Sequence, residues 1–567
     1  MKDYRNIGLR SMNANGKGCG ATRDYMVRLK QMKKEITVNT FSFEDIRSNG
    51  YLYVDKTRFV YNLVRSPLKN YYFISRPRRF GKSLMCSTLR ALFEGRRELF
   101  RGLYIESTDY SFEKYPVLHF DFSNINIETF DDFLRGFQKR LMDGAAANGV
   151  AVERAEPSEM LYGILGKLEK KAVILVDEYD YPFLHTYRDR ELSNSICNTL
   201  NSFYSVIKSC SGKIRFFYVT GITGFSSLST LSEMNGMTDL SMDEDYAAMF
   251  GYTEKELESY FGDYIDEYMS REDREYTERE EFIEAVRNYY DGYRFSFDSS
   301  VTVCNPVAVG RFFDDRFKFG SYWMDTGNNR LAVEKMKECH LQNIITEDLV
   351  LGIDEIMTFD YSCLREKTLS SQQVMALIYF TGYLTILEGD ADAITLTFPN
   401  TEVRKAFTRS LVKLFTGIEM SIFAQKAVKA VRSGKLENIA TVLNAYVKEY
   451  QYDGLDTGEK GYQEAFFSFF LMIGGVRASV EDRTLLGRSD AIVRAGKDVF
   501  IVEMKVDESA DKALAQIKEK EYWARYVNTE KRVHLIGLNF SSETRSVDEW
   551  KEKILDKSKI ATYLLDE

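Results

Sequence analysis

Apolar and polar positions follow two different periods along this chain. Apolar runs of strand length lie at residues 117–123, 171–180 and 215–223, and residues 71–93 pass from an apolar strand through a basic turn into a helical pattern. We interpret the first three runs as central strands, because buried strands appear as short, continuous apolar segments. Strands that alternate with helices predict an α/β fold with a parallel sheet between helices, and ligands bind such sheets at the C-terminal edge of the strands.

The chain changes character from about Asp239, where charged sequence carries apolar residues at helical intervals. This pattern predicts a helical lid whose charges form a solvated face. Residues 369–407 mix helical and strand patterns, from which we predict a helical, winged-helix-like connector. The longest apolar run, residues 465–476, is shorter than the roughly 20 residues that cross a bilayer, so we expect a buried helix and no membrane partner.

Composition limits the classes of function. The 567 residues suggest about three domains, and a formal net charge of -9 gives no global attraction to nucleic acid, so any such contact needs a local basic surface. The seven cysteines include no C-x-x-C pair and are expected as reduced thiols of a cytoplasmic protein. The histidines lie too far apart in sequence to predict a zinc site, and each is expected as a core or surface residue; they are His119, His185, His340 and His534.

The basic turn within residues 71–93 reads SRPRRFGKS and predicts a nucleotide phosphate cradle. Backbone N–H groups of such a loop and the positive end of the following helix attract phosphate, Lys82 reaches the outer phosphates and the Ser83 hydroxyl binds Mg²⁺. Arg76 stands where the first glycine of G-x-x-x-x-G-K-[ST] is expected, and Pro77 removes one backbone donor. A solvated basic loop is the alternative. The predicted binding residues are Arg76, Pro77, Arg78, Arg79, Phe80, Gly81, Lys82, Ser83 and Leu84.

Two further strand ends carry polar residues. KAVILVDEYD ends in adjacent carboxylates, of which Asp177 is predicted to hold Mg²⁺ through its hydration shell and Glu178 to orient and deprotonate the attacking water. The alternative for both is a strand end that reaches solvent. Thr220 is predicted as a polar sensor of the terminal phosphate, or alternatively as a threonine that caps its strand. A kinase is disfavoured, because Glu178 stands where a hydrolytic water needs a base.

The motifs SRPRRFGKS, VDEYDYP, TGITGF and YYDGYRF together resemble the AAA-ATPase-like family of prokaryotic P-loop proteins, which carry a C-terminal PD-(D/E)XK nuclease-like domain. That family shows the same RPRRFGK loop, and the resemblance extends from about Phe41 onwards. It implies an ATP-binding module. We expect the segment with Tyr53, Asp55 and Lys56 to be mainly structural, with Asp55 as a helix cap; because the resemblance places it just before the nucleotide loop, an approach of these residues to the base or the phosphates is the alternative. It leaves open whether Arg294 is an arginine finger or a packing residue.

A second site is predicted in DVFIVEMKV, residues 498–506, where alternation places Glu503 and Lys505 on one face of a strand. Asp490 in GRSD begins the preceding strand, so a hairpin brings the two acids together. Such carboxylates hold a hard cation, and Lys505 positions a water or stabilises developing charge. This arrangement suits phosphodiester hydrolysis.

The resemblance to PD-(D/E)XK domains adds residues to this second site. It matches Glu459, or the nearby Glu464, to the acid of the first helix, and Asp490, Glu503 and Lys505 to the motif itself. Gln516 matches the glutamine of the following helix, which also carries Lys520 and Tyr522. The alternative is a restriction-endonuclease-like fold that only binds or acts as a scaffold.

These patterns predict a definite domain order and activity. The predicted parts are a disordered basic leader (1–40), a P-loop ATPase core (41–238), a helical lid (239–330), a helical, winged-helix-like connector (331–439) and a restriction-endonuclease-like α/β domain (440–567). We expect ATP and Mg²⁺ as cofactors, with Mn²⁺ an alternative at the nuclease site, and ATP hydrolysis coupled to cleavage of nucleic acid, DNA rather than RNA, by a homo-oligomer. The alternative is a nucleotide-controlled assembly switch whose C-terminal domain only binds.

Overall fold

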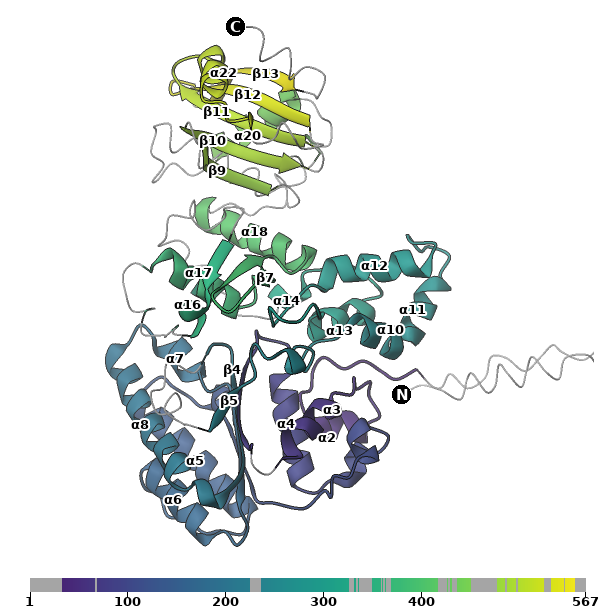
Figure 1. The fold of residues 1–567 in the computed structure, drawn as a ribbon, viewed down its shortest axis with the longest axis vertical. Coiled ribbons are helices and arrows are strands. Elements are labelled where there is room, and N and C mark those ends of the chain that lie inside the picture. Colours follow the sequence, from purple (N-terminus) through teal and green to yellow (C-terminus); the bar gives the residue numbers. More distant parts are fainter. Residues whose placement is uncertain are drawn as a thin grey trace, which may run out of the picture.

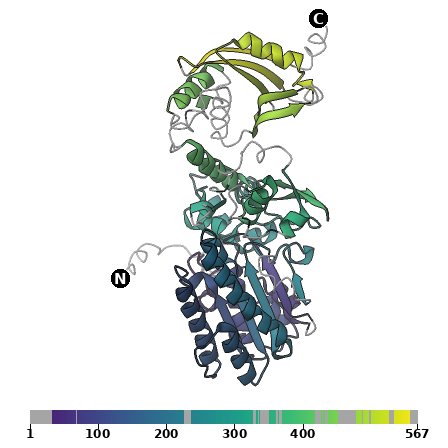
Figure 2. The ribbon, with the colours of Figure 1, turned by 90° about the vertical axis from the view of Figure 1, so that its left-hand side faces the viewer.

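The computed structural model describes residues 33–66, 69–224, 236–325, 349–357, 369–416, 436–449, 477–484, 487–495, 498–524, 532–544 and 546–555, with the short pieces 331–332, 335, 359, 363, 426 and 429–430. The described parts follow one another along the long axis of the molecule: a first sheet with its helices, a middle region, and a second sheet (Figures 1 and 2).

The first part is a five-stranded parallel sheet, as the alternation of strands and helices predicts. Its strand order is β2-β3-β4-β1-β5, so a single strand, β4, separates the strand before the basic loop from the strand that ends in two acids. The strands are β1 (Tyr71–Ser75), β2 (Val117–Asp121), β3 (Ala172–Asp177), β4 (Ile214–Gly221) and β5 (Met237–Asp239).

Helices cover this sheet on both sides (Figure 1). One side carries α2 (Phe43–Ser48), α3 (Thr57–Val64) and α4 (Lys82–Phe93), and the other carries α5 (Phe130–Ala147), α6 (Pro157–Lys167) and α8 (Arg190–Ser209), with α7 (Tyr181–Thr186) following β3. Short 3-10 turns are η1 (Arg97–Phe100), η2 (Tyr104–Ser107), η3 (Phe122–Asn124), η4 (Ser211–Lys213) and η6 (Glu244–Tyr246).

The interpretation of residues 117–123 as a central strand is wrong. Within the described residues β2 pairs with β3 alone and lies at the edge of the sheet. The strand is apolar because helices pack over it: the ring of Phe120 lies 5.9 Å from that of Phe137 in α5 and 5.3 Å from that of Phe203 in α8. An edge strand buried by aromatic helices has the same sequence pattern as a central one.

The middle region contains helices and a small sheet. The helices of the expected lid are α10 (Glu254–Tyr260), α11 (Gly262–Met269), α12 (Arg279–Tyr290), α13 (Pro306–Asp314) and α14 (Tyr322–Asp325). The region predicted as a helical, winged-helix-like connector contains β6 (Leu349–Gly352), α16 (Ile353–Met357), α17 (Ser371–Phe380), β7 (Thr385–Gly389), β8 (Ala393–Thr397) and α18 (Thr401–Thr416), and its described strands form an antiparallel sheet in the order β6-β8-β7.

The last part is a mixed sheet in the order β13-β12-β11-β10-β9, in which the β11–β12 pair is parallel and the other pairs are antiparallel. Helix α22 connects the two parallel strands and packs on both, and its Ile517 is buried in one cluster with Ile492 and Ile501 of the sheet. This is the α/β sheet domain expected for a nuclease-like fold. The elements are α20 (Leu436–Glu449), β9 (Arg477–Thr484), β10 (Gly487–Ala495), β11 (Asp498–Val506), α22 (Ala510–Glu519), β12 (Arg532–Ser541) and β13 (Ser546–Leu555).

The segment before α2 departs from the predicted disordered leader. Residues 33–40 lie against the lid: Lys33 forms an ion pair with Glu267, and the side chains of Ile36 and Val38 approach Gly310 of α13. Residues 1–32 and the predicted buried helix at residues 465–476 lie outside the described residues. Over the part of the chain that the structure describes, no helix has the length and apolarity to cross a membrane.

Candidate functional site

The basic loop joins β1 to α4 and is closed by its own lysine. Gly81, the residue before the helix, has φ of 100°, a left-handed conformation that glycine adopts without a steric cost. Lys82 begins α4, is 4% exposed, and donates from Nζ to the carbonyl oxygens of Arg76 (3.0 Å) and Pro77 (3.1 Å). The ammonium group therefore lies inside the loop, where the phosphate cradle was predicted.

Arg76 stands where the motif has its first glycine, and its side chain bonds the loop to neighbouring backbone. Its guanidinium is buried, donates to the carbonyl oxygens of Ser75 (2.8 Å) and Ser241 (2.7 Å), and lies 4.2 Å from the ring centre of Phe295. Burial lowers the pKa of Arg76 to about 10. The predicted nucleotide-binding residue thus contributes its backbone to the loop interior, while its side chain connects the loop to the segment after β5.

Other loop residues contact the middle region. The ring of Phe80 lies 4.8 Å from that of Tyr293, within the YYDGYRF motif. A methyl group added to Gly382 would lie 2.7 Å from Pro77, and the indole N–H of Trp323 donates to the carbonyl oxygen of Arg78 at 3.3 Å. The lid and the connector therefore meet the loop directly.

Asp177, at the end of β3, stands beside Ser83 as predicted. It is 1% exposed, and its Oδ1 has no hydrogen-bond partner among the described residues. Burial raises its pKa to about 7, and a hydrogen bond from Ser83 acts in the opposite direction. A buried carboxylate oxygen without a donor, next to a hydroxyl, fits the oxygen ligands that Mg²⁺ prefers.

Glu178 follows in a left-handed conformation, with φ of 51°. For a residue with a side chain this costs on the order of 1–3 kcal/mol, and such residues cluster at functional sites. Burial raises the pKa of Glu178, and the charge of Lys82 opposes the shift. A carboxylate with a raised pKa near the lysine of the loop suits a general base.

The two strand-end loops are bonded to each other, which the sequence reasoning missed. Asp180 Oδ2 accepts from the backbone N–H groups of Ile222 (2.7 Å) and Thr223 (2.9 Å). A methyl group on Gly221 would lie 2.6 Å from the ring of Tyr179, so only glycine fits there. The sequence offers a signal for this contact, because Asp180 and Gly221 each lie close to a predicted site residue.

Thr220, the predicted sensor, is fully buried in β4. Its Oγ1 has no hydrogen-bond partner within the described ranges, although the capping alternative requires one. An unpaired buried hydroxyl near the C-terminal end of the strand favours the sensor interpretation.

A cavity of about 100 Å³ adjoins the first turn of α4. Tyr53 and Lys56 line it, whereas Asp55 accepts hydrogen bonds from the backbone N–H groups of Thr57 (2.8 Å) and Tyr104 (2.6 Å). The remaining lining residues come from the segment before α2, α2 and the segment that follows it, the loop and α4, and the lid: Thr37, Val38, Thr40, Phe41, Ile46, Leu52, Val54, Arg79, Phe80, Gly81, Leu84, Met85, Thr88, Met249, Phe250, Gly251, Tyr252, Pro306 and Val307.

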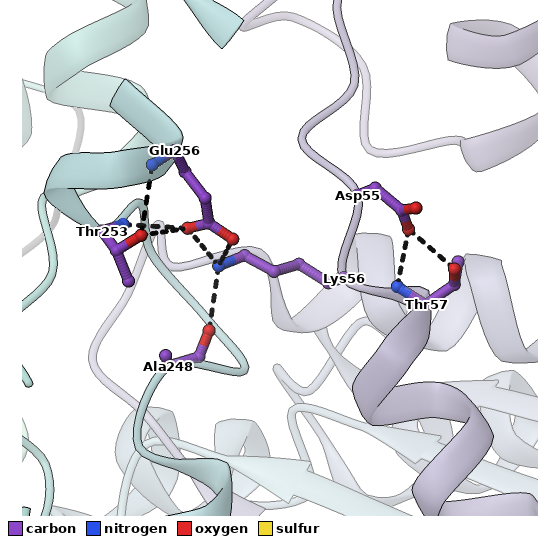
Figure 3. Close-up of polar contacts among 6 residues, drawn as sticks. All are labelled: Asp55, Lys56, Thr57, Ala248, Thr253 and Glu256. Carbon is purple, nitrogen blue, oxygen red and sulfur yellow. Dashed lines mark hydrogen bonds and ion pairs between the residues drawn. The ribbon is translucent and has the colours of Figure 1, made fainter. Parts of the chain in front are cut away.

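An ion pair connects one wall of this cavity to the lid (Figure 3). Lys56 Nζ lies 2.7 Å from both carboxylate oxygens of Glu256 and 2.9 Å from the carbonyl oxygen of Ala248. Glu256 also accepts from the backbone N–H of Thr253, which caps α10. The ammonium group of Lys56 is therefore bonded to the lid. Lys56 lines the cavity, but its charge is paired with Glu256.

Two arginines of the middle region have different environments. Arg294 donates to the carbonyl oxygens of Ser299 (2.6 Å), Leu387 (2.6 Å) and Phe297 (2.7 Å), so in this chain it is a packing residue. Arg311 in α13 was missed by the sequence reasoning. Its Nε is buried without a partner among the described residues, and its charge contributes to the lowered pKa of Arg79 in the loop.

The second predicted site lies on β11 and α22. Glu503 is fully buried, and its Oε1 accepts from Lys505 Nζ at 3.2 Å and from Gln516 Nε2. Gln516 also donates to the hydroxyl of Tyr522 at 3.5 Å. The expected hairpin is present: Ala491 pairs with Val502, so one step further along the backbone register residue 490 stands opposite residue 503.

Of the remaining predicted residues of this site, the structure describes Lys520 alone. Lys520 forms an exposed ion pair with Glu519 at 3.3 Å and lies outside the cluster. Glu459 and Glu464 lie outside the described residues.

His185 bonds the carbonyl oxygen of Tyr181 and His534 bonds Glu552, as expected for structural histidines, and His340 lies outside the described residues.

Comparisons with known proteins match the two domains in which these residues lie. The family model described as predicted AAA-ATPase matches residues 37–230, and the model of the PD-(D/E)XK nuclease superfamily matches residues 457–550. A protein of Azotobacter chroococcum mcd 1, described as an uncharacterized protein in the vnfD 5' region, is 30% identical over 539 residues, which cover 91% of this chain and 98% of that protein.

Proposed function

Because the chain belongs to the predicted AAA-ATPase family and carries a domain of the PD-(D/E)XK nuclease superfamily, we propose that it hydrolyses ATP at the first sheet and cleaves nucleic acid at the second. The ATPase proposal rests on one observation above the others. Asp177 presents a buried, unpaired carboxylate oxygen beside Ser83, at the end of a strand next to the loop that holds Lys82. This is a donor set for Mg²⁺ beside a phosphate cradle.

The roles of the chain's residues follow from their positions. Ser83 and Asp177 hold the ion, which when bound neutralises charge on the outer phosphates. Lys82 exchanges its bonds to the loop carbonyls for phosphate oxygens. Glu178 accepts a proton from the attacking water, Thr220 contacts the terminal phosphate, and the cavity bounded by Tyr53 takes the base.

The nuclease proposal rests on the buried cluster around Glu503. Residue 490 faces it across the hairpin, and carboxylates at these two positions suit a divalent cation, Mg²⁺ or Mn²⁺. Lys505 and Gln516 position the Glu503 carboxylate, and Lys505 stabilises the charge that develops on the phosphate. DNA is the proposed substrate ahead of RNA.

Direct contacts between the phosphate loop and the lid and connector support coupling of the two activities, because nucleotide binding changes the loop that Trp323 and Gly382 touch. The proposed protein is cytoplasmic, as its scattered cysteines without a C-x-x-C pair suggest. A second candidate, an assembly switch controlled by the bound nucleotide, is favoured by the same contacts and needs no cleavage. We propose that the protein forms a homo-oligomer under either candidate function.

The ATPase is tested with Glu178→Gln. This variant should bind ATP and Mg²⁺ with an affinity within a few-fold of the wild type and lose at least about 100-fold of the hydrolysis rate, because only the base is removed. The matched control is Glu153→Gln, which alters an exposed glutamate and should hydrolyse ATP at the wild-type rate. Hydrolysis that persists in Glu178→Gln would contradict the role of this residue.

The nuclease is tested by incubating labelled single- and double-stranded DNA and RNA with Mg²⁺ or Mn²⁺, with and without ATP. Cleavage by the wild type that Glu503→Ala abolishes supports the nuclease, and its dependence on ATP supports coupling. If ATP is hydrolysed and no substrate is cut under any of these conditions, the assembly switch replaces the nuclease, and light scattering with ADP or ATP then measures assembly.

A further inference from the structure

Three residues of metal-binding type meet beneath the phosphate loop. They are Cys86 in α4, His119 in β2 and Asp177 at the end of β3, and each offers one ligand atom, with all three atoms within 4.8 Å of one another. They come from three separate elements, so the fold, and not local sequence, assembles the group.

The sheet register explains the meeting. Asp121 of β2 pairs with Asp177 of β3, and His119, two residues earlier on β2, projects to the same face as Asp121. Helix α4 packs against β2 and β3 and brings Cys86 toward them. Because strand alternation and helix packing fix these positions, the group does not depend on a mobile loop.

The interior of this group is polar and incompletely bonded. Cys86 and Asp177 are 0% and 1% exposed, and neither Asp177 Oδ1 nor His119 Nε2 has a hydrogen-bond partner among the described residues. Unpaired buried polar atoms cost on the order of 1–3 kcal/mol each, so two of them directed at one group need a compensating ligand.

The donor types select the ligand. A thiolate, an imidazole and a carboxylate form the ligand combination of zinc-like ions, and three protein ligands leave a fourth position for water. Magnesium requires oxygen ligands in octahedral geometry and does not suit sulfur or imidazole. We propose that Cys86, His119 and Asp177 bind a divalent transition metal of the zinc type at a site that shares Asp177 with the magnesium position.

The position of the site has a functional consequence. Asp177 belongs to both sites, so a zinc ion held by Cys86 and His119 withdraws the carboxylate that magnesium needs. Zinc therefore inhibits ATP hydrolysis, a consequence that rests on the proposed ATPase activity, whereas metal binding itself does not.

Binding is tested with Co²⁺ on the full-length protein without nucleotide, because cobalt bound to a thiolate absorbs in the near ultraviolet and oxygen-bound cobalt does not. The wild type should show this band with one equivalent of metal. Cys86→Ser should lose it, and His119→Gln should weaken Co²⁺ binding at least about tenfold. Cys304→Ser, which alters another buried cysteine, should leave the band unchanged.

Circular dichroism and melting curves establish that each variant is folded, and the partly exposed His119 provides a test that is independent of the buried cysteine. A wild type without the thiolate band, or a band that persists in folded Cys86→Ser, would overturn the site.

The inhibition is tested separately: Cys86→Ser should hydrolyse ATP with Mg²⁺ and resist Zn²⁺ at concentrations that stop the wild type. A wild type without any hydrolysis would refute the proposed ATPase and leave the cobalt result to decide the metal site. Equal Zn²⁺ sensitivity would refute the shared-ligand inhibition.

Discussion

Lys56 Nζ lies 2.7 Å from each carboxylate oxygen of Glu256, although 200 positions separate the two residues in the sequence. The lysine side chain is 9% exposed and the glutamate side chain 21%. Burial lowers the pKa of Lys56, and the charge of Glu256 opposes that shift. The pair therefore holds a lid helix against the wall of the cavity beside α4.

Removing one partner of this pair should cost more than removing both. Glu256→Gln leaves the Lys56 ammonium buried without a counter-charge and is expected to lower the free energy of unfolding by about 2–4 kcal/mol. Lys56→Met added to it should recover most of that loss. Urea denaturation of the two single variants and the double variant measures the coupling; equal, additive losses would contradict it.

Asp177→Asn should change the pH dependence of stability. The folded chain keeps this proton up to about pH 7, whereas the model value for an unperturbed aspartate is 3.8, so the folded state binds more protons between these values. The free energy of unfolding of the wild type therefore falls as pH rises through this window. The asparagine variant does not titrate here, so it should be more stable than the wild type at pH 8 by on the order of 2–4 kcal/mol.

Melting curves from pH 4 to pH 8 in EDTA, without nucleotide, measure this difference. The difference should shrink toward pH 4, close to the value of 3.8 for an unperturbed aspartate, because Asp177 is there protonated in the folded chain and close to half protonated in the unfolded chain. Magnesium and ATP should reverse the order at pH 8, because only the wild type offers the carboxylate. A constant difference at every pH would show that Asp177 does not titrate in this window.

Gly292→Ala should disrupt the contact between the YYDGYRF motif and the connector. Gly292 has φ of 109°, and a methyl group there would lie 2.0 Å from the carbonyl oxygen of Pro399. We expect the free energy of unfolding to fall by more than about 2 kcal/mol, because the alanine is strained at this φ and displaces the neighbouring backbone. Gly163→Ala is the matched control, because that helical glycine has open space around it and alanine favours helices by up to about 1 kcal/mol.

Gln516→Met should disturb the nuclease site without removing a carboxylate. The variant keeps a similar length and loses the donor to Glu503, a hydrogen bond to a charged group that contributes roughly 1.5–3 kcal/mol. The metal concentration for half-maximal cleavage should change several-fold. Lys520→Met on the same helix removes only an exposed ion pair with Glu519 and should change stability by less than about 1 kcal/mol.

Spacing within single motifs predicted much of the first site. Lys82 and Ser83 follow the loop glycine, and Asp177 and Glu178 end an apolar strand, so their approach at the sheet edge follows from the topology of parallel strands. The direction of the Arg76 side chain did not follow from spacing, because it depends on carbonyl groups supplied by the segment after β5.

Contacts between distant segments set the limit of prediction from sequence. Glu256 as the partner of Lys56 and His119 as a neighbour of Cys86 depend on how the lid docks and how the strands align, which local periodicity does not encode. The edge position of β2 escaped prediction for a related reason, since aromatic helices bury an edge strand as completely as neighbouring strands bury a central one.

The hydrogen bond from Trp323 to the carbonyl oxygen of Arg78 provides the phosphate loop with an optical reporter. The chain has three tryptophans, and the other two, Trp523 and Trp550, lie in the C-terminal domain. Replacing those two with phenylalanine would leave one fluorophore whose indole N–H is bonded to the backbone of the loop. Its emission then registers rearrangement of that backbone in real time, before any phosphate is released and without a labelled nucleotide.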